Sequence, residues 1–386
     1  MQFVDEFRDP TAARALIQRI QHDAEILATK RDEPLRLMEV CGGHTHTIYR
    51  YGLENLLPES IDLIHGPGCP VCVIPMGRVD DAIWMAKQPN VLLTTFGDMM
   101  RVPGSKDSLM HARAEGCDIQ FVYSPLDALK LAQEHPEKEV VFFAVGFETT
   151  APSTAVTLEA AKKHGVRNFS VFSNHVTIEP PMRAIINGGK TAVDGFIGPG
   201  HVSTIVGTKA FDFLAQEFNK PVAVAGFEPL DILQAVSMLL TQFVSGQVAK
   251  GHAEVQNQYA RVVRPTGNPA ALALMDKVFS LRDTFEWRGL GWLEHSGLGI
   301  ADAYADWDAE RRFKVPGNRI ADPKACECGS VLTGRIKPWQ CKVFGTACTP
   351  DTPIGTCMVS PEGACAAFYN FGRIDRATTE ELAAQR

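Results

Sequence analysis

The chain has 386 residues, of which 45% are hydrophobic and 22% are charged, so it is long enough to bury substantial cores in two or three domains. Its formal net charge is −7, from 38 basic and 45 acidic residues, which argues against nucleic acid or an anionic membrane surface as the main partner. No apolar stretch approaches the length of a membrane span and the acidic N-terminus does not resemble a secretory signal, so we expect a soluble, cytoplasmic protein.

The first two thirds of the chain alternate strand-like and helix-like segments. Short apolar runs predict strands at Leu35–Val40, Ile61–Ile64, Val91–Thr95, Ile119–Tyr123, Val140–Val145, Phe169–Ser173, Val193–Ile197 and Val222–Ala225. Periodic stretches predict helices at Val79–Gln88, Leu126–His135 and Ser153–Lys163. Strands separated by helices indicate βαβ units and parallel sheets.

Eight such strands are compatible with one barrel or with two smaller sheets. We favour two sheets because the glycine punctuation repeats: Gly-Pro-Gly occurs at 66–68 and 198–200, and Gly-Phe-Glu at 146–148 and 226–228. From about Leu230 the pattern changes to helices, at Leu230–Phe243, His252–Val263 and Pro269–Phe279. We therefore predict two small parallel-sheet α/β domains facing a cleft, at 1–124 and 125–229. A helical connector and a small C-terminal iron–sulfur domain are predicted to follow at 230–386.

The motif CGGHTHT at 41–47 directly follows a predicted strand. A residue at the carboxyl end of a parallel strand lies in the crevice where open α/β sheets hold their ligands. The helix start that follows would lower the pKa of the Cys41 thiol, which makes Cys41 a candidate nucleophile or soft metal ligand. His44 and His46 follow within reach, although either imidazole alone could equally be structural.

The motif HGPGCPVC at 65–72 also follows a strand and contains a C-x2-C pair. Cys69 and Cys72 suit a redox dithiol, in which one sulfur attacks and the other resolves. The same pair could form half of a zinc site, with further ligands from Cys41 or the histidines. The prolines on either side indicate a loop, whereas a thioredoxin-type motif opens a helix. We favour redox chemistry.

The motif GFETTAP at 146–152 leads from a strand into a helix whose start could bind an anion or be simply capped. Glu148 could orient a histidine or accept a proton. His175 and His201 lie at two further strand ends and are expected to converge on the same crevice. The sequence Gly-Gly-Lys-Thr at 188–191 lacks the first glycine of a phosphate loop, so we reject a Walker A site. Cys117 is most simply a spare buried thiol.

The tail holds six of the ten cysteines, at Cys326, Cys328, Cys341, Cys348, Cys357 and Cys365. Persistent disulfides need an oxidising compartment, so a metal is the better explanation for a cytoplasmic chain. Structural zinc sites usually use close C-x2-C pairs, which this tail lacks. Spacing therefore favours an iron–sulfur cluster over zinc, but it does not select four ligands from six thiols.

Together these motifs resemble the HypD family, the maturation factors of [NiFe]-hydrogenases. The resemblance covers nearly the whole chain and rests on CGGHTHT, HGPGCPVC, GFETTAP, GPGHVS and the tail KPWQCKVFGTAC…PIGTCMVSPEGACAAFY. It implies a [4Fe-4S] cluster whose ligands are Cys326, Cys341, Cys348 and Cys365. It also implies that Cys328 and Cys357 form a redox-active pair beside the cluster, similar to that of ferredoxin:thioredoxin reductase.

The resemblance further implies a scaffold that works with the small chaperone HypC. On this scaffold iron acquires two cyanides and one carbon monoxide before transfer to the hydrogenase large subunit, with HypE delivering the cyanide after HypF has carbamoylated it. Cys41 would bind this transient Fe(CN)2CO iron and His44 would be a neighbouring ligand or proton donor. Cys69 and Cys72 would relay reducing equivalents. His201 and Glu148 would manage protons or support the cleft.

Two other classes of function remain open at this point. A stand-alone iron–sulfur thiol-disulfide reductase would need only the dithiol and the cluster, whereas iron assembly needs the third thiolate site at Cys41. A structural zinc protein that docks partners would be colourless, so a visible spectrum distinguishes it from both.

Overall fold

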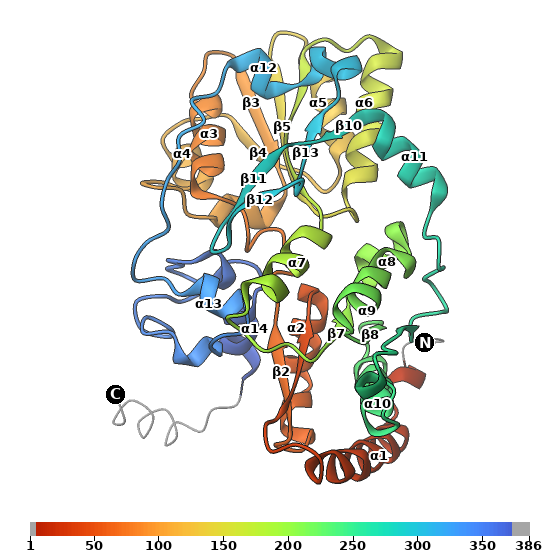
Figure 1. Cartoon of the computed structure of the whole chain (residues 1–386). Helices are drawn as coiled ribbons and strands as arrows, with labels where there is room; N and C mark the ends of the chain where they lie inside the picture. The colour runs from red at the N-terminus through yellow and green to blue at the C-terminus, as the bar shows by residue number, and fades with distance from the viewer. Residues whose placement is uncertain (1–4, 373–386) are drawn as a thin grey trace.

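The strands of the protein form two main sheets, and a cysteine-rich C-terminal segment packs beside them (Figure 1). The computed structural model describes residues 5–372. The mixed α/β class and the choice of two parallel-sheet units instead of one barrel are confirmed. All eight predicted strands are present, with ends that differ by a few residues.

The first sheet has five parallel strands in the order β2-β1-β7-β8-β9. These strands are β1 (Leu35–Glu39), β2 (Ile61–His65), β7 (Gly195–Gly198), β8 (Val222–Val224) and β9 (Val255–Asn257). Successive side chains of a strand point to opposite faces, so the sheet has two different cores. Leu35 and Leu37 pack in the cluster that includes helices α1 (Pro10–Ala28) and α10 (Pro229–Val244). Met38 and Val40 pack in the cluster that includes the cysteine loop and tail.

The second sheet has six strands in the order β10-β13-β6-β5-β3-β4. They are β3 (Val91–Thr95), β4 (Ile119–Phe121), β5 (Glu139–Gly146), β6 (Phe169–Val176), β10 (Phe279–Leu281) and β13 (Gly297–Ile300). The central strands β5 and β6 are almost entirely buried, as expected for parallel strands covered on both faces. Strands β13 and β10 join antiparallel at one edge.

Helices cover both sheets and their ends follow local sequence signals. Ser124 and Asp127 form a capping box at the start of α5 (Pro125–Glu134), and Gly165 ends α6 (Ala151–His164) with a left-handed backbone, φ 66°. The remaining α-helices are α2 (Gly42–Arg50), α3 (Met76–Ala86), α4 (Leu109–Ala114), α7 (Glu179–Gly188), α8 (Gly200–Val206), α9 (Asp212–Phe218), α11 (Pro269–Val278), α12 (Ala309–Phe313), α13 (Cys328–Leu332) and α14 (Ala364–Phe371).

The chain passes three times between the two sheets. It builds β1 and β2 in the first sheet, β3 to β6 in the second, β7 to β9 in the first again, and β10 and β13 in the second. The strand order therefore does not follow the predicted divisions at 124/125 and 229/230. Parallel strands need long connections, and here three connections lead into the other sheet, between β2 and β3, β6 and β7, and β9 and β10. Residues 1–4 and 373–386, at the ends of the outer predicted domains, lie outside the described residues.

The predicted helical connector is only partly helical. Helices α10 and α11 match their predictions, but the segment predicted as the helix His252–Val263 contains strand β9 followed by turns. The Gly- and Trp-containing stretch forms the hairpin of β11 (Thr284–Trp287) and β12 (Gly291–Glu294). Pairing of β9 with the edge of the first sheet outweighs the weak helical periodicity of this segment.

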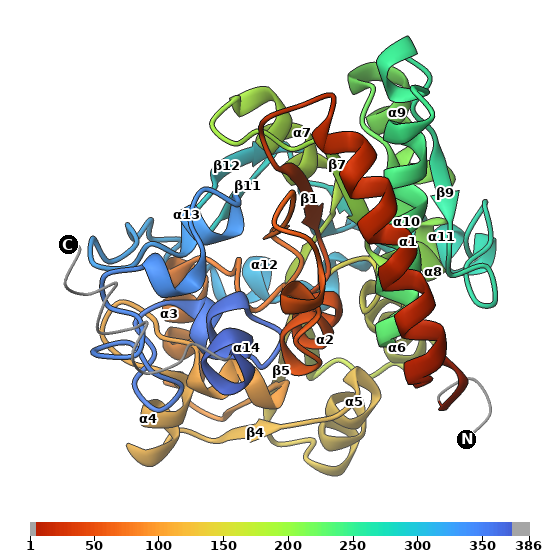
Figure 2. The ribbon, with the colours of Figure 1, turned by 90° about the horizontal axis from the view of Figure 1, so that it is seen from below.

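The C-terminal segment closes the molecule on the side of α2. Helix α14 lies next to α2, seen from below in Figure 2. Arg101 donates hydrogen bonds to the carbonyl groups of Pro350 and Val359, at 3.3 and 2.7 Å. The tail therefore contacts elements that lead into both sheets.

Candidate functional site

Cys41 lies between β1 and α2, as the sequence predicts. Its extended backbone, φ −147° and ψ 122°, makes it the residue that precedes the first turn of α2. The side chain is 5% exposed. The Cys41 Sγ lies 3.8 Å from the His201 Nδ1, so the structure brings together the ends of β1 and β7. These strands are neighbours in the first sheet.

The expectation that the helix start lowers the pKa of Cys41 is wrong. Burial raises the pKa of the thiol, and the nearby carboxylates of Glu362 and Glu39 raise it further. Hydrogen bonds from the backbone of Gly43 and His201 act in the opposite direction but are smaller effects. Desolvation and like charge both disfavour a thiolate. Cys41 is therefore a protonated thiol until a cation compensates its charge.

Two histidines flank the aromatic ring of Phe227 near Cys41. His201 stacks on this ring with a centroid distance of 3.9 Å, and His44 stacks on it at 4.9 Å. The His44 Nε2 lies 3.1 Å from the carbonyl oxygen of Ala225, whereas its buried Nδ1 has no hydrogen-bond partner within residues 5–372. Burial lowers the pKa of both histidines. Both rings are neutral and therefore suited to act as ligands or hydrogen-bond partners.

The loop that carries the C-x2-C motif packs directly on Cys41. The Gly42 N–H donates to the Gly68 carbonyl at 3.2 Å. A Cβ atom added to Gly68 would lie 2.2 Å from the backbone nitrogen of Cys41, so only glycine fits there. Helix α3 begins at Met76, which places Cys69 and Cys72 in a loop, as predicted. Both thiols are buried, and the Cys72 N–H donates to the Cys69 Sγ at 3.3 Å.

The C-x2-C loop also contacts the cysteine tail. The thiols of Cys72 and Cys357 lie close enough to change each other's pKa, and the Thr356 hydroxyl donates to the Cys72 carbonyl at 2.5 Å. The thiols of Cys328 and Cys365 are likewise near neighbours of Cys357. These contacts, above all the one with Cys328, hold the pKa of Cys357 well below its usual range. A continuous series of thiols thus leads from Cys69 into the tail.

The tail cysteines suit an iron–sulfur cluster by their chemistry. The Sγ atoms of Cys326 and Cys328 lie side by side against Gly355, and the thiols of Cys341 and Cys348 lie close enough to Cys326 to interact with its charge. Thiolates are the usual ligands of such clusters, so the donor set fits the predicted group. Within residues 5–372, no three Cys, His, Asp or Glu side chains are already arranged around a common point to hold a metal ion. The choice of four ligands among the six stays a prediction.

Glu148 lies at the end of β5, in the second sheet. Its Oε1 accepts a hydrogen bond from the Ile178 N–H at 3.0 Å, and its Oε2 is buried with no hydrogen-bond partner in the part of the chain that the structure describes. Burial raises the pKa of Glu148 to about 7. The side chain lines a cavity of about 760 Å³ together with residues of α7 and the β12 hairpin strand, including Arg183 and Trp292. Cys41 is not among the residues that line this cavity.

His175 does not join Cys41 and His201. It lies in β6, where the Thr154 and Ser173 hydroxyl groups are each 3.3 Å from one of its ring nitrogens. Burial lowers its pKa to about 3. This is a neutral core histidine. The expected convergence of all strand-end residues on one crevice therefore holds for Cys41 and His201, whose strands share a sheet, and not for His175.

Sequence reasoning missed four residues of the site: Glu39, His65, Phe227 and Glu362. Glu39 is 1% exposed, and its carboxylate accepts a hydrogen bond from the Cys41 N–H at 2.9 Å. A charged residue inside an apolar strand was the available signal, since buried charges are rare unless they are held by partners. Glu362 lies within the long tail motif, but its approach to Gly42 depends on tertiary packing.

The comparison with known proteins agrees with these motifs. The family model HypD, described as "Hydrogenase formation hypA family", matches residues 11–372. The chain belongs to the HypD family. HypD of Rhodobacter capsulatus, named a hydrogenase maturation factor, is 52% identical over 376 residues, covering 96% of this chain and 98% of that protein.

Two further HypD proteins show the same extent of similarity, and both are named hydrogenase maturation factors. The one from Escherichia coli K12 is 49% identical over 371 residues, and the one from Cupriavidus necator is 47% identical over 380 residues. These alignments cover 96% and 97% of this chain, and 98% of each relative. As for membranes, no helix within residues 5–372 is long and apolar enough to cross one.

Proposed function

We propose that this HypD protein is a hydrogenase maturation factor that, with a HypC-type small chaperone, binds iron and assembles its Fe(CN)2CO form in the cytoplasm. The observation that carries the proposal is the position of Cys41. Its thiol lies beside His201, and the C-x2-C loop that packs on its backbone continues into the thiols of the tail.

Cys41 is the proposed ligand of the iron that is being assembled. A soft thiolate suits low-spin iron that carries strong-field ligands. The raised pKa of Cys41 supports the need for a cation, because the positive charge of iron compensates the thiolate that burial, Glu362 and Glu39 disfavour. His44 and His201, both held neutral by burial, are proposed to act as a neighbouring ligand or hydrogen-bond partner.

The dithiol of Cys69 and Cys72 is the proposed source of the two electrons that release cyanide from its sulfur carrier. HypE would present the cyanide as a thiocyanate, after carbamoylation by HypF. Cleavage of the sulfur–carbon bond consumes two electrons and leaves cyanide for the iron and a thiolate on the carrier. Oxidation of the two thiols to a disulfide supplies both electrons and releases two protons, of which one protonates the carrier thiolate and the other passes to solvent.

Cys326, Cys341, Cys348 and Cys365 would hold the [4Fe-4S] cluster, which supplies single electrons when bound. Cys328 and Cys357 would be the redox-active pair next to it. The thiol contact between Cys72 and Cys357 supports this arrangement, because thiol-disulfide exchange requires sulfurs in direct contact. Cys357, whose pKa is lowered by its thiol neighbours, is the natural attacking sulfur of this set.

Glu148 is proposed to take up and release a proton near neutral pH, because its pKa is raised to about 7. It would act at the cavity beside α7, not at Cys41. The completed iron centre would pass to the large subunit of the hydrogenase.

The second candidate function is a stand-alone iron–sulfur thiol-disulfide reductase. The contact of the C-x2-C loop with the tail thiols favours it equally. A reductase of this kind gives Cys41 no role, since thiol-disulfide exchange between the dithiol and the tail does not need a third thiol. The two functions therefore separate at Cys41.

A cellular assay tests the proposal. Cells that lack their own HypD would receive the wild-type chain, Cys41→Ser or Cys117→Ser, and hydrogenase activity would be measured. Cys117 lies beside β4 in the second sheet, so its variant is the matched control. We expect activity to be lost with Cys41→Ser and kept with Cys117→Ser. Full activity with Cys41→Ser would favour the reductase.

A further inference from the structure

Glu39 is a buried carboxylate that three donors hold in place next to Cys41. The Cys41 N–H donates to its Oε2 at 2.9 Å. The Thr45 hydroxyl donates to its Oε1, and the His65 Nδ1 lies 2.7 Å from the same atom. Such a carboxylate is stable in a protein interior only while its hydrogen bonds are made.

The tautomer of His65 sets the direction of each bond. With the hydrogen on Nδ1, His65 donates to the Glu39 carboxylate and its Nε2 is an acceptor. The Tyr49 hydroxyl lies 2.5 Å from this Nε2 and therefore donates to it. Tyr49, His65 and Glu39 thus form one chain of hydrogen bonds that ends at the backbone of Cys41. We call these three residues the Glu39 chain.

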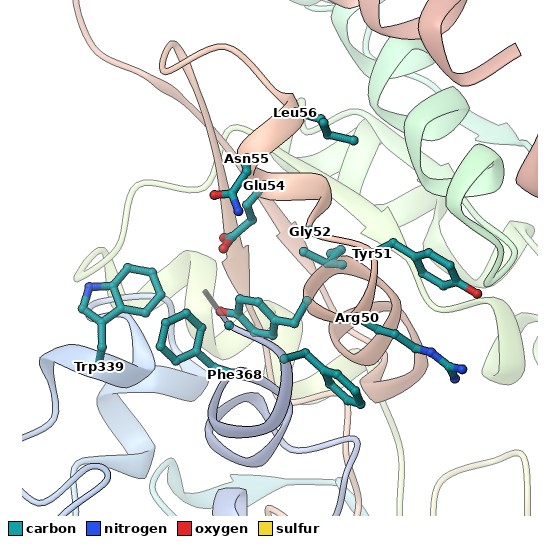
Figure 3. A pocket seen from close by; sticks show the side chains of 12 residues that line it. Arg50, Tyr51, Gly52, Glu54, Asn55, Leu56, Trp339 and Phe368 are labelled. Carbon is teal, nitrogen blue, oxygen red and sulfur yellow. The ribbon is translucent and has the colours of Figure 1, made fainter. Parts of the chain in front are cut away.

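The outer end of the Glu39 chain lies against the cysteine tail. The Tyr49 ring meets Phe368 of α14 with a centroid distance of 5.2 Å, and Phe368 meets Trp339 at 4.4 Å. Tyr49 forms part of the wall of a pocket of about 400 Å³, which Trp339 and Phe368 line from the tail (Figure 3). Cys365 lies one helical turn before Phe368 on α14. The position of α14 on α2 therefore bears directly on Tyr49.

We propose that Glu39 is the positioning residue of Cys41, and that Tyr49 and His65 couple the position of α14 to the position of Glu39. The inference rests on the proposed role of Cys41 as iron ligand and deepens it, because it couples the cysteine tail to the iron site through a second route besides the thiols. Loss of one hydrogen bond in the Glu39 chain lets the Glu39 carboxylate move. The backbone of Cys41, which donates to this carboxylate, then moves with it.

The test uses the full chain with two variants, Tyr49→Phe and Glu39→Gln. Tyr49→Phe keeps the ring and removes only the hydroxyl. Tyr304→Phe is the matched control, because Tyr304 is also buried and its hydroxyl also makes a side-chain hydrogen bond, with the carboxylate of Glu159, next to the second sheet. The first readout is the rate at which iodoacetamide alkylates Cys41 in the anaerobic, iron-free protein, divided by the rate for Cys117 in the same sample.

We expect the ratio of the two rates to change by roughly tenfold in Tyr49→Phe, as for the loss of one buried hydrogen bond. The change should be larger in Glu39→Gln, whose amide presents a donor where three donors already meet. Tyr304→Phe should keep the wild-type ratio. Division by the Cys117 rate corrects for a general loosening of the fold, which would accelerate the alkylation of both thiols.

The second readout is the infrared spectrum of each variant purified with the small partner. Cyanide and carbon monoxide bands that weaken or shift in Tyr49→Phe and Glu39→Gln, but not in Tyr304→Phe, would extend the positioning role to bound iron. A wild-type rate ratio in both variants overturns the inference, whatever the spectrum. A changed ratio in a protein whose wild type shows no such bands supports the positioning role and contradicts only the iron role of Cys41.

Discussion

At the scale of single residues, the environment decides the chemistry. Cys41 has the place that the sequence predicts, but burial and two carboxylates raise its pKa against the effect of the helix start. The position of a motif at a strand end follows from local pattern. The protonation state of Cys41 does not follow from local pattern. It depends on Glu39, an unexpected charge inside an apolar strand, and on Glu362, which comes from the distant tail.

Glu148 gives a residue-scale prediction for stability. Its pKa rises from the usual 4.5 in the unfolded chain to about 7 in the folded protein. The folded state therefore binds the proton more tightly, so its stabilising contribution is full below pH 4.5 and is lost as the pH rises through 7. This difference corresponds to roughly 3 kcal/mol. Glu148→Gln should remove it.

Chemical denaturation of wild type and Glu148→Gln at pH 5 and pH 8 measures this effect. The free energy of unfolding of the wild type should fall more between the two pH values than that of the variant. An equal fall in both proteins would show that Glu148 titrates normally. His175 acts in the opposite sense, because burial lowers its pKa from 6.5 to about 3 and the unfolded chain therefore binds the extra proton at pH 5. His175→Gln should make the fall in the free energy of unfolding between pH 5 and pH 8 larger.

At the scale of elements, close backbone contact joins the two motifs that carry Cys41 and the dithiol. Gly68 tests this contact. A Cβ atom there would lie 2.2 Å from the nitrogen of Cys41 and 2.3 Å from the carbonyl carbon of Val40. Backbone atoms cannot move aside as a flexible side chain can, so Gly68→Ala should reduce the free energy of unfolding by about 3 kcal/mol.

Gly97→Ala is the control for this substitution, because among residues 5–372 its added Cβ would meet no atom within 4 Å beyond its immediate chain neighbours. It should change the free energy of unfolding by less than about 1 kcal/mol. Urea denaturation followed by circular dichroism compares the two variants. Equal stability of Gly68→Ala and Gly97→Ala would mean that the loop does not rest on Cys41 as described.

The elements themselves were largely predictable. Alternation of apolar runs and amphipathic stretches identified all eight strands of the first two thirds, because buried parallel strands are continuous in hydrophobicity. The stretch 252–263 was predicted incorrectly as a helix. Its only three paired residues, Val255–Asn257, form a strand through contact with β8, and no local pattern contains that information.

At the scale of the whole molecule, the path of the chain could not be read from the sequence. The prediction of two sheets is confirmed, but both Gly-Pro-Gly motifs follow strands of the first sheet, β2 and β7, and so do not mark one sheet each. The order of strands depends on which connection returns to which sheet. The meeting of Cys72 with Cys357, far apart in the sequence, is likewise a property of the assembled fold. Motif content predicted which residues matter, and topology decides which of them meet.

The interleaved strand order predicts that the first 124 residues do not fold alone. Within them, β1 lacks its partner β7 and β3 lacks its partner β5. A fragment of residues 1–124 should show no cooperative unfolding, whereas the full chain should. A fragment with a sharp thermal transition and dispersed amide resonances would contradict this and would restore the predicted domain boundary.

The central claim is that iron acquires its diatomic ligands at Cys41. The most direct test is an anaerobic infrared spectrum of the chain purified with its HypC-type partner, compared between wild type and Cys41→Ala. The account predicts stretching bands of metal-bound cyanide and carbon monoxide in the wild type and their loss in the variant, with the visible absorption of the cluster kept in both. Bands that persist in Cys41→Ala, or a cluster-containing wild type without them, would contradict it.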